Sequence, residues 1–144
     1  MKIMGMLKAD AASEGGAPPS AEMMARMGDF IEEVTRAGVL LATDGLKPSS
    51  EGKRVRLSEG KVTVTDGPFT ESKELVASYA LFQVKTMDEA IEWTTRFLEV
   101  LGEGECELRP IFEASDFAPD IFPPEEAARE EATREQMQRN AAVA

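Results

Sequence analysis

The side chains best suited to acid–base chemistry surround residues 66–74 in the middle of the chain. A carboxylate with a raised pKa can act as a general base, a lysine or arginine can hold an anionic or enolate oxygen, and a tyrosine can donate a proton. We predict a site with three catalytic residues, Asp66, Tyr79 and Arg109, and three ligand-binding residues, Asp10, Glu71 and Lys73. The alternative is structural: Lys73 and Arg109 neutralise Asp66 and Glu71 in an ion-pair network that ties a loop to a sheet.

The chain contains no histidine, and Cys106 is its only cysteine. Imidazole bases, histidine-containing triads and the usual zinc ligand sets are therefore excluded, and so is an intramolecular disulfide. Any acid or base must be a carboxylate, lysine, tyrosine or cysteine. Since no carboxylate spacing resembles a calcium-binding loop, we predict neither a metal nor another cofactor.

The formal net charge of −11 argues against binding to nucleic acid or to anionic membranes. No apolar run approaches the 18 or so residues of a membrane-spanning helix, and the apolar start is too short for the core of a signal peptide. We therefore expect a cytoplasmic protein with one compact domain.

A rigid turn, Asp66-Gly67-Pro68, precedes these ionisable residues. Pro68 fixes its own φ, has no N–H to donate, and restricts the residue before it. A loop with few alternative shapes suits the aiming of side chains, although a plain connection with solvated charges has the same composition.

Hydrophobic periodicity predicts the elements that carry this loop. Helices are expected from Ser20 to Gly38 and from a capping box at Thr86 and Glu89 to residue 101, the second with a Glu92–Arg96 pair. Residues 10–20 read as a loop and Thr43-Asp44-Gly45 as a turn. Strands are expected at residues 2–8, 39–42, 75–85 and 105–113, with a β-hairpin at 53–57 and 61–65.

Without the hairpin, the order is strand, helix, strand, strand, helix, strand, which predicts an α+β, ferredoxin-like βαββαβ fold with an inserted β-hairpin. Two helices can cover only one face of a four-stranded sheet, yet the first and third large strands are apolar on both faces. We therefore expect a homodimer in which a second copy covers the other face.

Residues 66–74, with the sequence DGPFTESKE, resemble the signature of the DGPF-domain, or YCII-related, family, whose usual form is DGPFAETKE. The resemblance extends over about residues 1–112, through Gly38, Gly45-Leu46 and Leu108-Arg109-Pro110-Ile111, while Ala77-Ser78 replaces a usual glycine pair. It implies a dimeric α+β barrel. Distant relatives are thought to use a His and Asp pair, and that mechanism does not transfer because this chain lacks the histidine.

Residues 114–144 change in character. Phe117, Ile121 and Phe122 suggest an arm laid over apolar surface, and Pro123-Pro124 precedes a charged helix with little to bury. We predict a family domain at residues 1–113 and a C-terminal arm with a charged helical tail at 114–144.

Three functional classes remain open. The first is an enzyme or binding protein for a small anionic or polar metabolite, in a cavity near the DGPF loop of the homodimer. The second is a non-catalytic regulatory protein, because the resemblance implies association with an extracytoplasmic-function sigma factor. The third is a structural dimer with no ligand.

Overall fold

The computed structural model describes all 144 residues except the side chain of Ser72. The chain divides into two compact units, Met1–Ile111 and Phe112–Ala144.

The first unit is built on a four-stranded antiparallel sheet with the strand order β2-β5-β1-β6. This order confirms the ferredoxin-like prediction, because the first and third strands of the βαββαβ core lie at the centre. The strands are β1 (Lys2–Lys8), β2 (Leu40–Gly45), β5 (Val76–Gln83) and β6 (Cys106–Pro110).

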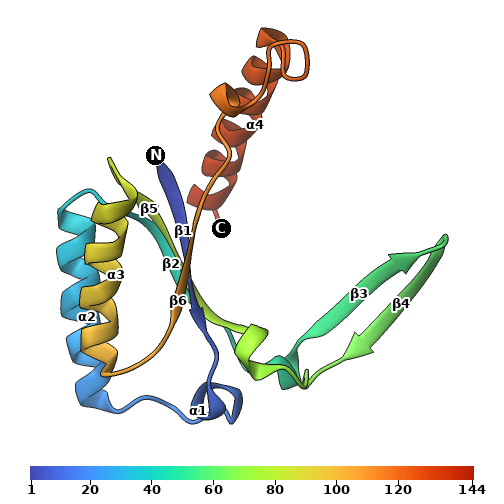
Figure 1. Ribbon diagram of the computed structural model, residues 1–144. Helices are drawn as coiled ribbons and strands as arrows, with labels where there is room; N and C mark the ends of the chain where they lie inside the picture. The colour runs from blue at the N-terminus through green and yellow to red at the C-terminus, as the bar shows by residue number, and fades with distance from the viewer. The chain divides into compact units, whose positions relative to one another are not determined.

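Helices α2 (Ala21–Arg36) and α3 (Met87–Leu101) lie side by side on one face of this sheet (Figure 1). The predicted helix starts are confirmed: the Ser20 hydroxyl accepts the N–H of Met23, and the Thr86 hydroxyl accepts that of Glu89. The core lies between the helices and the sheet and includes Ile3, Val34, Val39, Phe82, Val84 and Ala90.

Arg96 joins the two helices. Its guanidinium lies 4.8 Å from the centre of the Trp93 ring and donates to both carboxylate oxygens of Glu33 in α2, at 2.7 Å each. The predicted pair with Glu92 is therefore wrong. A carboxylate on the neighbouring helix, which Arg96 reaches while its guanidinium lies over an aromatic face, suits a planar guanidinium better than a carboxylate one turn away.

The predicted hairpin forms a separate two-stranded sheet from β3 (Lys53–Ser58) and β4 (Lys61–Asp66). Val55 pairs with Val64, and Leu57 pairs with Val62, so the four side chains share one face. All four are exposed, from 57% for Val64 to 72% for Val55 and Leu57. The hairpin therefore has the predicted apolar face, and among the described residues no other part of the first unit buries it.

Two sequence predictions fail near the sheet edge. The expected turn at Thr43-Asp44-Gly45 is instead the end of β2, where Asp44 pairs with Tyr79 and Gly45 with Ser78. Pairing with β5 outweighs the turn preference of these residues. The expected loop at residues 10–20 contains a short helix, α1 (Ala11–Glu14), because Asp10 and Ser13 form a reciprocal cap.

The 66–74 loop passes very close to residues 49–52. The N–H of Gly67 donates to the carbonyl of Gly52 at 3.0 Å, and a Cβ at position 67 would lie 1.7 Å from the carbonyl oxygen of Ser49. Only glycine allows this approach. The segment that the loop approaches includes the 3-10 turn η1 (Ser49–Glu51), and a second 3-10 turn, η2 (Ser72–Glu74), ends the loop.

The second unit contains a 3-10 turn, η3 (Ala114–Asp116), and helix α4 (Pro124–Ala142). Three phenylalanines of this unit form a chain of tilted ring contacts. The ring centres of Phe112 and Phe117 lie 5.1 Å apart, and those of Phe117 and Phe122 lie 5.9 Å apart. No residue of α4 is buried, so the unit has a small aromatic cluster and a solvated helix.

Replacing Gly67 by alanine tests the close approach of the loop. We expect Gly67→Ala to lower the free energy of unfolding by about 1–3 kcal/mol, because the new methyl group meets a backbone carbonyl. The matched control is Gly28→Ala in α2, where a Cβ would meet nothing within 4 Å. The control should raise stability by about 0.5–1 kcal/mol. Chemical denaturation measures both, and equal effects at the two positions would contradict the packing described.

Candidate functional site

The face of the sheet away from the helices carries the best candidate for chemistry. Residues paired directly across an antiparallel sheet share a face, and successive residues alternate. Since Ile3 and Phe82 are paired and buried under the helices, Met4, Met6, Tyr79 and Leu81 point to the other face. We call it the open face.

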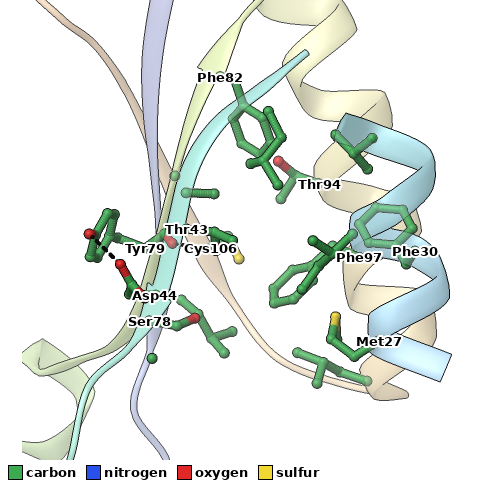
Figure 2. Close-up of a pocket in the computed structure, with 18 of the residues that line it drawn as sticks. Met27, Phe30, Thr43, Asp44, Ser78, Tyr79, Phe82, Thr94, Phe97 and Cys106 are labelled. Carbon is green, nitrogen blue, oxygen red and sulfur yellow. Dashed lines mark hydrogen bonds between the residues drawn. The ribbon is translucent and has the colours of Figure 1, made fainter. Parts of the chain in front are cut away.

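Tyr79 and Asp44 form a hydrogen-bonded pair on the open face (Figure 2). The Tyr79 hydroxyl donates to Oδ2 of Asp44 at 3.0 Å. This hydrogen bond, followed by the negative charge of the carboxylate, raises the pKa of Tyr79 above its ordinary value of 10. Tyr79 therefore stays protonated near neutral pH, as a proton donor must, and Asp44 holds its hydroxyl in place.

Charged residues flank the apolar centre of the open face. Glu107 in β6 pairs with Met6, and its carboxylate lies 3.5 Å from Nζ of Lys8, whose side chain is only 18% exposed. Arg109, two residues further along β6, pairs with Met4 and is exposed. Tyr79 and Arg109 therefore share a face, on strands separated by β1.

The catalytic residue predicted in the loop, Asp66, lies apart from this face, at the base of the hairpin. It forms an ion pair with Lys53, which is opposite it in β3. The alternative network, in which Lys73 and Arg109 neutralise Asp66, is not the arrangement found: Asp66 is neutralised within its own hairpin.

The loop itself is held by residues that the sequence did not single out. The N–H of Phe69 donates to the Ser49 hydroxyl at 3.0 Å, and this hydroxyl in turn donates to the Glu14 carboxylate. The Phe69 ring also accepts the guanidinium of Arg54, 3.9 Å from the ring centre. Much of the signature therefore maintains loop shape.

The three predicted ligand-binding residues lie near one end of the sheet. The N–H of Ala9 donates to the carbonyl of Leu75 at 2.9 Å, which joins the segment before Asp10 to the segment after Lys73. Glu71 and Lys73 are exposed. The Ser13 backbone N–H that donates to Asp10 lowers the pKa of this carboxyl, so Asp10 is an ionised cap rather than a base.

Sequence reasoning missed Asp44, Lys8 and Glu107. Lys8 and Glu107 alternate into the same face as Met6, which strand periodicity alone could have indicated. Asp44 had no such signal because its residue type and neighbours favour a turn. Among the described side chains, no group of three carboxylates or thiols converges as metal ligands would.

The sequence profile of the YCII-related domain family matches residues 1–115, so the chain belongs to that family. An uncharacterized protein of Rhizobium meliloti (strain 1021) is 32% identical over 76 residues, which are 52% of this chain. The match spans 61% of the length of that relative. Among the described residues, no helix is long and apolar enough to cross a membrane.

The chain is also similar to a solved structure, that of 5-chloro-2-hydroxyhydroquinone dehydrochlorinase from Burkholderia phenoliruptrix in complex with 2,5-dihydroxybenzoquinone. It is 10% identical, and the comparison covers 82% of this chain and 100% of the other, with a TM-score of 0.44.

The tyrosine–carboxylate pair can be tested directly because Tyr79 is the only tyrosine. Titration of tyrosinate absorbance should give a pKa above 10 in the native protein, and Asp44→Asn should bring it down towards 10. The pKa of Tyr79 is higher in the folded protein than in the unfolded chain, so the pair stabilises the fold up to about pH 10. This contribution is lost as the pH rises through the pKa of Tyr79 in the folded protein. Identical titrations of the two proteins would contradict the pairing.

Proposed function

We propose that this protein is a homodimer that binds, and acts on, a small polar or anionic metabolite between the open faces of two sheets, near the DGPF loop. The observation that carries the proposal is the Tyr79–Asp44 pair, a positioned proton donor on a sheet face that no element of the first unit covers.

The open face has an apolar centre that favours a second copy as its cover. Met4, Met6 and Leu81 are only partly buried on it. Burying apolar surface is worth roughly 25 cal/mol per Å², so pairing two such centres favours association. A two-fold arrangement would place the same charged residues around both halves of the interface.

The charges on this face favour an anionic or polar ligand. Among the described side chains, Arg109 has no ion pair, in a chain whose net charge is −11. An arginine without a carboxylate partner, beside an apolar surface, can bind a carboxylate or enolate oxygen in bidentate fashion. In this proposal Arg109 anchors the ligand and Tyr79 donates the proton.

We assign the remaining predicted residues to the loop side of the proposed cavity, although Asp66 lies apart from the open face within one chain. We assign Asp66 as the base, and Asp10, Glu71 and Lys73 as ligand contacts from the loop end of the sheet. Asp66 could take this role only by exchanging its Lys53 partner for the ligand. Residues 114–144 serve as an accessory arm to a functional domain at residues 1–113.

A second candidate function is a non-catalytic regulatory protein that associates with an extracytoplasmic-function sigma factor. The exposed Val55, Leu57, Val62 and Val64 face of the hairpin favours it, since exposed apolar patches mark interaction sites. A ligand panel separates the two functions, because only the first requires a small molecule.

The ligand site is tested by thermal shift with a panel of small carboxylates and enolizable keto acids. We expect a hit whose affinity falls about tenfold or more in Arg109→Gln, since a hydrogen bond to a charged group is worth about 1.5–3 kcal/mol. Arg26→Gln on α2 is the matched control and should leave the affinity unchanged. Absence of any shift, or equal losses in both variants, would favour the regulatory function.

The second copy is tested by a charge on the open face. We expect Leu81→Glu to yield a protomer with the single-chain mass of 15.7 kDa, whereas the native protein has twice that mass. Ile91→Glu, at an exposed position of α3, should remain dimeric. Multi-angle light scattering measures all three proteins, and a native mass of one chain would refute the homodimer.

A further inference from the structure

A cavity of about 460 Å³ lies on the opposite side of the sheet, between it and the two helices (Figure 2). Its walls come from α2, α3 and the helix-facing side of all four strands, and include Leu7, Met27, Phe30, Phe97, Leu101 and Cys106. Ligand cavities in proteins commonly measure about 300–1,000 Å³ and are mostly apolar. The size and lining therefore match a small-molecule site.

One fully buried polar atom in this wall has no hydrogen-bond partner among the described residues. Thr94 is 7% exposed, and its hydroxyl makes no hydrogen bond within the described structure. The next residue, Thr95, satisfies its hydroxyl in the usual helical way by donating to the carbonyl of Ile91 at 2.8 Å. Figure 2 shows the Thr94 oxygen directed from α3 towards the sheet, beside Phe82. A buried hydroxyl without a partner is costly, and a ligand oxygen would satisfy it.

The other polar side chains of the wall either have a hydrogen-bond partner or are uncharged. The Thr43 hydroxyl donates to the carbonyl of Tyr79 at 2.8 Å. Asp44, the only charged residue of the wall, turns its carboxylate to the Tyr79 hydroxyl on the open face. A charged ligand would therefore lose its hydration with no countercharge in exchange.

We propose that this cavity binds a small uncharged molecule with an apolar body and one hydrogen-bonding oxygen, such as an alcohol, phenol or ketone, whose oxygen meets the Thr94 hydroxyl. The site is separate from the one on the open face. It lies on the other side of the sheet and selects against the anions that Arg109 would attract.

Cys106 provides a reporter within the wall. Burial, and then the charge of Glu105, raises the pKa of its thiol to about 11. The thiolate is the reactive form, so alkylation near neutral pH should be slow and should accelerate about tenfold per pH unit up to that pKa. A ligand in the cavity should slow the reaction further.

The experiment uses the full chain with 1-octanol as the probe and octanoate as its anionic match. Calorimetry should detect binding of 1-octanol and at least tenfold weaker binding of octanoate. Alkylation of Cys106 by N-ethylmaleimide should slow as 1-octanol saturates the protein. Failure of 1-octanol to bind, or unchanged alkylation at saturation, would overturn the proposal.

Variants locate the bound probe. Thr94→Val, which keeps the shape of the side chain, should weaken 1-octanol about fivefold. Ala80→Leu fills the cavity and should weaken the binding of 1-octanol more than tenfold. Ala25→Leu, on the exposed side of α2, should leave this affinity unchanged. If Ala80→Leu fails to fold, Thr94→Val decides, and unchanged affinity in that variant overturns the proposal.

Arg109→Gln separates the two proposals. It should leave 1-octanol binding unchanged, and loss of binding in this variant would place the probe on the open face instead. Failure of the carboxylate panel would not affect this outcome.

Discussion

The structure depends on an imbalance between its helices and its sheet. Two helices cover one face of the four-stranded sheet. Among the described residues of the first unit, no helix or strand covers the other face. The same strands therefore carry two different surfaces, a core under the helices and an open face with an apolar centre. Both proposed sites follow from this division, one on each side of the sheet.

Most contacts of the DGPF loop are structural. Its glycine allows a close backbone approach, its phenylalanine N–H binds Ser49, and its aspartate pairs with Lys53. These contacts hold the start of the loop against η1 and the base of the hairpin. Among the described side chains, Glu71 and Lys73 form no ion pair, and the proposal assigns them to the ligand. The signature therefore chiefly maintains the shape of the loop, and the proposed proton donor, Tyr79, lies in the strand that follows it.

Much of the fold could be predicted from the sequence because local and long-range preferences agree. The alternation of Val55, Leu57, Val62 and Val64 defines the hairpin, and Ser20 and Gly38 mark the limits of α2. The sequence predictions failed where local and long-range preferences conflict. Asp44 has the residue type of a turn but pairs in a strand, and Arg96 finds a carboxylate on another helix rather than one turn away. Such choices depend on tertiary contacts that periodicity does not contain. The cavity at Thr94 was also beyond prediction, since an unpaired hydroxyl is visible only when every neighbour is placed.

The central claim is that a second copy of this chain covers the open face, and nuclear Overhauser contacts between chains test it most directly. In a sample that mixes labelled and unlabelled chains, the account predicts interchain contacts to the methyl groups of Met4, Met6 and Leu81. It predicts none to Val34, which is buried under the helices. If the open-face methyl groups show no interchain contact in the folded protein, the second cover does not exist and the account is wrong.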